Sequence, residues 1–216
     1  MEIKVLKDIL GANEQIAGIN RQLLDSNNVF AVNLMSSPGA GKTSLILETI
    51  KRLKGKTRIG VIEGDVSSSL DAEVISKEGV PVVQINTGGG CHLDANMASS
   101  ALGNVPLKDI ELLIIENVGN LICPAEFALG EHKNVLISSI PEGDDKPFKY
   151  PLIFHKADAV LINKIDLLPY LKFDTEAFSQ VIKGMNEEVE IFPLSCTTGE
   201  GLVQWVSWLM AQMGKG

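Results

Sequence analysis

A chain of 216 residues with 45% hydrophobic and 21% charged residues can bury a full core and has the composition of one globular domain. Nineteen basic against 27 acidic residues give a net charge of −8, which argues against a general affinity for nucleic acid or for an anionic membrane. Residues 1–4 carry no apolar leader, and no apolar run reaches the roughly 20 residues of a membrane span, so we expect a cytoplasmic protein.

Apolar residues recur at mostly helical spacing between residues 5 and 24. Gly11 and Gly18 argue against one continuous helix, and Asn13 is a candidate N-cap for a second helix that begins near Glu14. We therefore expect residues 1–28 to form a helical segment that packs on a main domain of residues 29–216.

An apolar, β-prone run at residues 29–35 leads into Ser36-Ser37-Pro38-Gly39-Ala40-Gly41-Lys42-Thr43, and helical apolar spacing follows at residues 44–50. A strand, a glycine turn and then Gly-Lys-Thr at the start of a helix indicate a phosphate-binding P-loop, although Ser36 replaces the first glycine of the motif. Lys42 is expected on the β- and γ-phosphates and Thr43 on Mg²⁺. The predicted nucleotide contacts here are Gly39, Ala40, Gly41, Lys42, Thr43 and Ser44.

Two carboxylates follow the next predicted strand, residues 57–62. Asp65 lies where a carboxylate at a strand end can hold Mg²⁺ or its water, and Asp71 can act on the metal or on the attacking water. Either residue can instead cap a helix or stand as a solvated charge.

A buried run at residues 110–115 has the character of a central parallel strand and ends in Glu116-Asn117-Val118-Gly119. This pattern is similar to the Walker B and switch II turn of GTPases, with glutamate in place of the usual aspartate. We expect Glu116 to serve Mg²⁺ and the Gly119 N–H to sense the γ-phosphate.

A guanine-binding motif of the form N-K-x-D follows the predicted strand at residues 158–162, as Asn163-Lys164-Ile165-Asp166. Asp166 can accept hydrogen bonds from the N1–H and the 2-amino group of guanine, whereas adenine offers neither. Asn163 is expected to contact the base edge or to hold the loop, and the Lys164 stem to stack on the base. After a last strand at residues 189–193, the loop with Ser195 and Cys196 is the second predicted guanine contact.

Strands alternate with helices along the whole chain, with a further strand at residues 80–85 and another at 134–140. This order predicts a single α/β domain of the P-loop NTPase type, with a mostly parallel, doubly wound sheet and helices on both faces. Trp205 and Trp208 fall in a closing helix, where we expect them to belong to the core.

Cys91, His92 and Cys123 are residues that GTP hydrolysis does not itself require. Thiolate and imidazole suit Ni²⁺ or Zn²⁺ better than Mg²⁺, and three donors leave a position open for exchange or for a ligand from a second chain. The alternative is that free cysteines act as small buried apolar residues, and we expect this of Cys196. An odd number of cysteines also argues against a disulfide framework.

Taken together, these motifs and the Glu142-Gly143-Asp144-Asp145-Lys146-Pro147 segment resemble the HypB family, the nickel-insertion GTPases of NiFe-hydrogenase maturation. The resemblance runs from about residue 29 to the C-terminus. It implies a GTP-hydrolysing metallochaperone that dimerises on binding GTP, with metal ligands Cys91, His92 and Cys123 at the dimer interface. It also implies a nickel metallochaperone partner and a hydrogenase large subunit as recipient. No Cys or His precedes Cys91, so N-terminal nickel storage is not expected.

Two other functions stay open at this level. One is an accessory GTPase for another metalloenzyme, such as urease or a cobalamin-dependent mutase. The other is a GTP-sensing interaction module whose cysteines are structural, which predicts no metal binding and no change of assembly with GTP.

Overall fold

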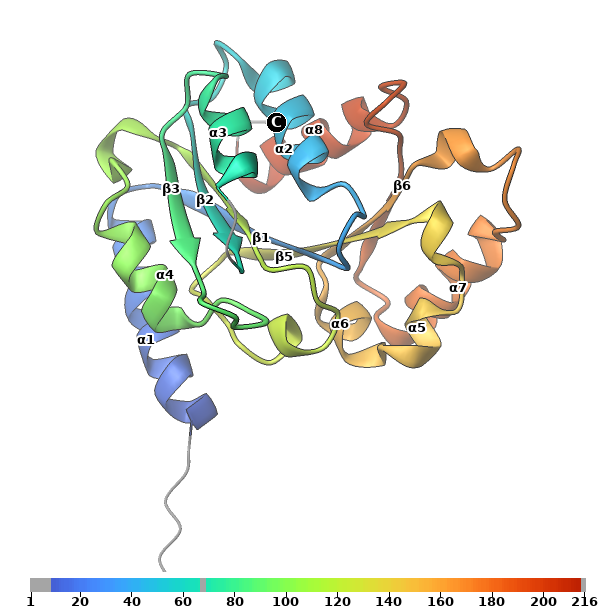
Figure 1. Ribbon diagram of the computed structural model, residues 1–216, viewed down its shortest axis with the longest axis horizontal. Helices are drawn as coiled ribbons and strands as arrows, with labels where there is room; N and C mark the ends of the chain where they lie inside the picture. Colours follow the sequence, from blue (N-terminus) through green and yellow to red (C-terminus); the bar gives the residue numbers. More distant parts are fainter. Residues whose placement is uncertain (1–8, 67–68, 215–216) are drawn as a thin grey trace, which may run out of the picture.

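The computed structural model describes residues 9–66 and 69–214 of the chain (Figure 1). The strands are β1 (Phe30–Ser36), β2 (Ile59–Asp65), β3 (Val82–Asn86), β4 (Leu112–Glu116), β5 (Lys133–Ser139), β6 (Ala159–Asn163) and β7 (Glu190–Pro193). The α-helices are α1 (Ile9–Ser26), α2 (Lys42–Leu53), α3 (Leu70–Ser76), α4 (Ala95–Leu102), α5 (Lys146–Lys149), α6 (Pro151–Lys156), α7 (Thr175–Met185) and α8 (Leu202–Gln212). Short 3-10 helices are η1 (Leu107–Asp109), η2 (Cys123–Ala125), η3 (Ile140–Glu142) and η4 (Ile165–Leu167).

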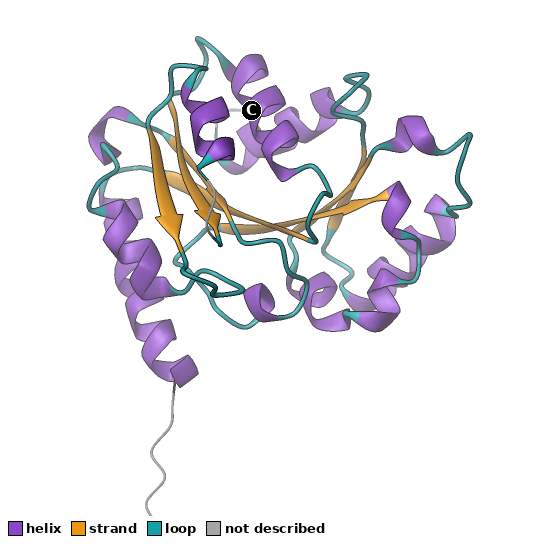
Figure 2. Cartoon of the chain, viewed as in Figure 1, coloured by secondary structure: helices purple, strands orange, loops and turns teal. Residues whose placement is uncertain are grey.

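The strands form one seven-stranded sheet in the order β3-β2-β4-β1-β5-β6-β7, and every adjacent pair is parallel. Helices cover both faces of this sheet, as Figure 2 shows. The predicted doubly wound α/β domain is confirmed. In such a sheet the loops after the strands gather at one edge, which is where ligands bind.

Alternate strand residues supply the two faces of the core. Val32 and Leu34 of β1 pack with α2, α3 and α8 in one cluster. Ala31 and Met35, on the opposite face of β1, pack in two further clusters that contain residues of α1 and α4 or of α6 and α7. The strands are therefore buried on both sides, which explains their continuous apolar runs in the sequence.

The N-terminal helix differs from its prediction. Helix α1 runs without a break through Gly11, Asn13 and Gly18. Asn13 is buried inside the helix, where its amide donates to Ala128 O at 2.8 Å and accepts from Ala95 N at 2.8 Å, so it does not cap a second helix. These tertiary hydrogen bonds override the helix-breaking tendency of the sequence. The predicted start near residue 5 lies outside the described residues.

Element boundaries near the ligand edge also differ. Strand β2 begins at Ile59 rather than residue 57 and extends through Asp65, because its last residues pair with β3. Helix α2 begins at Lys42, so the P-loop lysine already belongs to the helix. Trp205 is fully buried and stacks on the partly buried Trp208, in agreement with the prediction for the closing helix.

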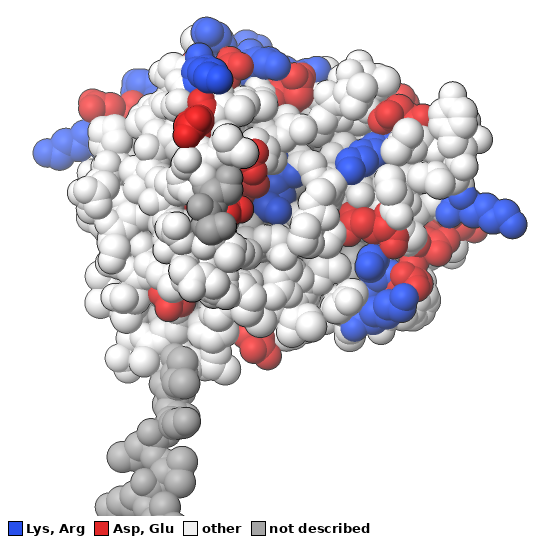
Figure 3. All heavy atoms as spheres, viewed as in Figure 1, with Lys and Arg blue, Asp and Glu red and all other residues white. Residues whose placement is uncertain are grey.

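Two surface properties of the described residues bear on possible partners. Among the residues described, no helix is both long and apolar enough to cross a bilayer. On the face drawn in Figure 3, acidic and basic side chains are interspersed.

Candidate functional site

The P-loop turn is built by two glycines with left-handed torsions. Gly39 has φ 76° and Gly41 has φ 106°, values that other residues rarely adopt. A Cβ on Gly41 would also collide with the Asn163 side chain. Lys42 Nζ donates to Ser36 Oγ at 3.1 Å, and this hydroxyl in turn donates to Ser37 O at 2.6 Å. The serine that departs from the usual motif therefore holds the lysine and the turn together.

Buried carboxylates lie beside the start of α2. Thr43 Oγ1 donates to Glu116 Oε1 at 3.2 Å, and Glu116 is opposite Glu63 in the register of β4 and β2. Oxygen atoms of Glu63, Asp71 and Glu116 all lie within 4.8 Å of one another. Although Glu63 and Glu116 are only 1% and 3% exposed, Oε2 of each has no hydrogen-bond partner. A set of hard oxygen donors with unpaired buried atoms fits Mg²⁺.

Burial changes the ionisation of these two carboxyls. Burial, strengthened by the neighbouring Glu116 carboxylate, raises the pKa of Glu63 to about 8. Burial also raises the pKa of Glu116 to about 7, against the lowering effect of Lys42. A divalent cation placed among them would favour the ionised forms and reverse both shifts.

A polar cavity of about 550 Å³ opens over these groups. Its lining contains most of the predicted phosphate and Mg²⁺ residues: Gly39, Gly41, Lys42, Thr43, Ser44, Asp65, Asp71 and Glu116. Gly119 lines it too, and a Cβ there would lie 3.0 Å from Pro38, so the turn after β4 packs directly on the P-loop. Ala40 is fully buried below the turn and is not in the lining, so only its backbone is available for a ligand.

The predicted guanine loops lie outside that cavity lining but are tied to the P-loop. Asn163 is 2% exposed; its amide donates to Ala40 O at 2.9 Å and accepts from Lys164 N at 2.8 Å. Of the two predicted roles for Asn163, these bonds favour holding the loop. Lys164, in a left-handed conformation with φ 65°, donates to Gly39 O at 2.6 Å.

Asp166 is held from the second loop. Ser195 Oγ donates to Asp166 Oδ1 at 2.5 Å. Ser195 Oγ itself accepts from the backbone N–H groups of Thr197 and Thr198, at 3.2 and 3.1 Å. Burial raises the pKa of the Cys196 thiol to about 11, and this side chain packs against the core. Cys196 is thus a small apolar side chain, as the sequence suggested, and only its backbone can serve the base.

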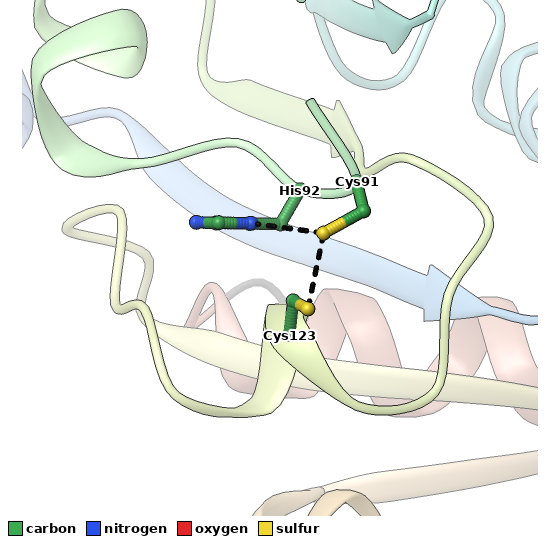
Figure 4. A group of neighbouring side chains, drawn as sticks. All are labelled: Cys91, His92 and Cys123. Carbon is green, nitrogen blue, oxygen red and sulfur yellow. Dashed lines mark hydrogen bonds between the residues drawn. The ribbon is translucent and has the colours of Figure 1, made fainter. Parts of the chain in front are cut away.

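The three soft donors lie together although 32 residues separate the two cysteines. Figure 4 shows Cys91 Sγ between its two neighbours, at 3.0 Å from Cys123 Sγ and 3.6 Å from His92 Nδ1. Burial lowers the pKa of His92, which keeps the imidazole neutral and able to bind metal. The hydrogen bond with Cys91 raises the pKa of the Cys123 thiol, and burial and charge repulsion from Cys91 act in the same direction. A bound divalent cation would remove that repulsion and release the protons.

Sequence reasoning missed Glu63 and Asn117. Glu63 was hidden inside a strand, yet a glutamate in an otherwise apolar run that ends in Asp65 was a usable signal. Asn117 is completely buried, and its role depends on the residues that contact it, which the sequence does not reveal.

Comparisons with known proteins agree with this geometry. The model of the CobW/HypB/UreG nucleotide-binding domain matches residues 30–193. The hydrogenase maturation factor HypB of Azotobacter vinelandii is 49% identical over 214 residues, which are 98% of this chain and 70% of that protein. The crystal structure of HypB from Archaeoglobus fulgidus superposes with a TM-score of 0.88 at 39% identity, over 94% of this chain and 99% of that one. The structure of HypB from Helicobacter pylori in complex with nickel gives 0.90 at 35% identity, over 94% and 96%. The chain therefore belongs to the HypB family of hydrogenase maturation factors, within the CobW/HypB/UreG nucleotide-binding proteins.

Proposed function

We propose that this protein is a GTP-hydrolysing metallochaperone that delivers nickel during the maturation of NiFe-hydrogenase. One observation carries the proposal: the turn that follows β4 lines the cavity of the P-loop at Gly119 and brings Cys123 to Cys91 four residues later. A nucleotide-sensitive turn and a soft metal site thus share one segment. Membership of the HypB family and the nickel named for the Helicobacter pylori relative support the choice of metal.

The phosphate end of the site has the residues for GTP hydrolysis. Lys42 would neutralise the β- and γ-phosphates, and Thr43, Asp65 and Glu116 would hold Mg²⁺. Mg²⁺ supplies charge neutralisation on the phosphate oxygens when it is bound. Glu63 lines the same cavity and would accept a hydrogen bond from metal-bound water. Asp71 also lines it and would act on an attacking water.

The base end has the residues for guanine. Asp166 would accept from the N1–H and the 2-amino group, with Ser195 fixing the orientation of the carboxylate. Asn163 would keep this loop against the P-loop rather than contact the base. The hydrogen bond of Lys164 to Gly39 O supports this proposal, because it would keep the lysine stem beside a nucleotide bound to the P-loop.

Nickel, or zinc with the same ligands, would be the cargo of Cys91, His92 and Cys123. Three donors leave a coordination position for exchange or for a second chain. We propose a homodimer promoted by GTP, with a nickel metallochaperone as donor and the hydrogenase large subunit as recipient, in the cytoplasm. Residues 29–216 would form the GTPase domain, with residues 1–28 as its packed N-terminal segment.

A nickel titration against a competing chelator tests the proposal with GDP and with a non-hydrolysable GTP analogue. The unmodified protein should bind nickel with affinities that differ several-fold between the two states, on the order of 1 kcal/mol. Cys123→Ser should weaken metal binding and remove most of the difference, while Cys196→Ser, the matched control, should keep both. An absence of nickel binding would instead favour an interaction module with structural cysteines.

A further inference from the structure

Adjacent residues at the end of β4 face opposite sides of the sheet. Glu116 points to the nucleotide side, where it accepts from Thr43 Oγ1. Asn117 also borders the nucleotide cavity, but its side chain is fully buried and bonds toward the other side, with Oδ1 accepting from Leu93 N at 3.0 Å. Because Leu93 directly follows His92, one strand end contacts both the nucleotide cavity and the metal-binding loop.

Leu93 is held from two strands that border the cavity. Asn117 Oδ1 also accepts from Val118 N at 2.9 Å, and its Nδ2 donates to Asn33 Oδ1 at 3.1 Å, so the amide has a fixed orientation. On the other side, a Cβ on Gly64 would lie 2.7 Å from the Leu93 side chain. Residues at the ends of β2 and β4 therefore both contact Leu93, the residue next to the metal ligand His92.

A second asparagine joins the same two segments. Asn120, between Gly119 and Cys123, donates from Nδ2 to Cys91 O at 3.3 Å. Its Oδ1 accepts from Ile122 N at 2.9 Å. Two amide side chains from one turn thus hold the backbone of the loop that carries Cys91 and His92.

We propose that Asn117 and Asn120 are positioning residues that make residues 91–93 move as one body with the turn at residues 116–123. A change of nucleotide state then displaces all three metal donors together, rather than Cys123 alone. The proposal rests on the proposed function, because it assumes nucleotide in the cavity and metal on the soft donors. Its physical basis is that separating Leu93 N from Asn117 Oδ1 would leave buried polar groups unpaired, whereas joint movement keeps the bond.

The test compares nickel affinity in the GDP state and in the GTP-analogue state, using Ni²⁺ in a chelator buffer. Asn120→Ala should lower the ratio of the two affinities at least about two-fold toward one, because two of the three donors no longer follow the turn. Asn117→Ser should do the same. Asn104→Ala is the matched control: its amide donates to Ser100 O at 2.9 Å on α4, away from both sites, and it should keep the ratio of the unmodified protein.

The ratio of the two nickel affinities distinguishes a positioning role of the asparagines from a purely structural one. Equal weakening of metal binding in both states, or an unchanged or larger ratio, would overturn the proposal. Thermal unfolding and GDP affinity identify variants that fail to fold; if Asn117→Ser fails, the half-buried Asn120 decides alone. Equal nickel affinities in the two nucleotide states of the unmodified protein would contradict the proposed function, because nucleotide and metal would not be coupled. Coupling that is present and survives both substitutions would contradict only the role of Asn117 and Asn120.

Discussion

Asp166 is the proposed determinant of base choice. Asp166→Asn replaces a hydrogen-bond acceptor with a donor against the guanine N1–H and 2-amino group. Each mismatched group costs about 1–3 kcal/mol, so GTP affinity should fall about ten-fold or more, while xanthosine triphosphate gains. Competition binding with labelled nucleotides measures both. Ser195→Ala is the control, because loss of the supporting hydroxyl should weaken both nucleotides alike. Equal binding of ATP and GTP by the unmodified protein would refute the assignment.

Glu63 gives the ligand-free protein a pH-dependent stability. Its folded pKa of about 8, and that of Glu116 at about 7, lie above the ordinary value of 4.5, so the folded state binds more protons than the unfolded chain between these values. The free energy of unfolding should therefore be highest near pH 5 and fall as the pH rises to 8, by up to about 1.4 kcal/mol per pH unit for each proton. Urea denaturation at several pH values should show a shallower fall in Glu63→Gln.

The exposed Glu187→Gln serves as control for that series and should keep the full slope. Mg²⁺ with GDP should flatten the slope in the unmodified protein, because a bound cation favours the ionised carboxyls. A slope that Glu63→Gln leaves intact would place the titrating group elsewhere.

Residues with a motif were predictable, and residues that act through tertiary contacts were not. The sequence placed Lys42 after one strand and Asp166 after another, as the structure has them, because their motifs have fixed spacing along the chain. The meeting of Cys91 with Cys123 was suspected from residue type alone, since only the fold brings their sulfur atoms to 3.0 Å. No sequence pattern predicted the hydrogen bonds of Asn117 with Leu93 and Asn33.

At the scale of elements, buried polar contacts hold helix α1 on the domain, and the apolar periodicity of its sequence does not predict them. Asn20 is 1% exposed and donates from Nδ2 to Ala95 O and Leu129 O, at 2.8 and 2.9 Å. Ala95 is the first residue of α4 and Leu129 follows η2, so each carbonyl lies a few residues after a metal-site segment. The second helix start for which Asn13 was a candidate cap does not occur, because glycine propensity is local, whereas these bonds are not.

Asn20→Ala should lower the free energy of unfolding by about 1–3 kcal/mol, because two buried carbonyls lose their donor. Chemical denaturation measures the change. Gln22→Ala, at an exposed position on the same helix, should have an effect within about 0.5 kcal/mol. An equally small effect of Asn20→Ala would mean that its two hydrogen bonds contribute little to the stability of the fold.

At the scale of the whole molecule, the soft donors lie where a second copy can reach them. Cys91 is exposed and Ile122, next to Cys123, is 59% exposed. Sedimentation should show a larger fraction of dimer with a GTP analogue than with GDP, and a further increase with nickel that a chelator reverses. Cys91→Ser should abolish the nickel-dependent increase and leave the effect of the nucleotide. A monomer under all conditions would contradict the proposed assembly.

The sheet order also has a consequence for how the chain folds. Strand β1 is central, yet its partners β4 and β5 follow it by roughly 80 and 100 residues: Phe30 pairs with Leu112, and Val32 with Lys133. During synthesis the P-loop therefore leaves the ribosome long before the strands that flank β1 exist. Closing such long loops is slow, and the early apolar strands stay unpaired in the meantime. The proposed guanine loop after β6 forms only once that strand has emerged, so more than half of the chain must avoid aggregation before nucleotide can stabilise the domain.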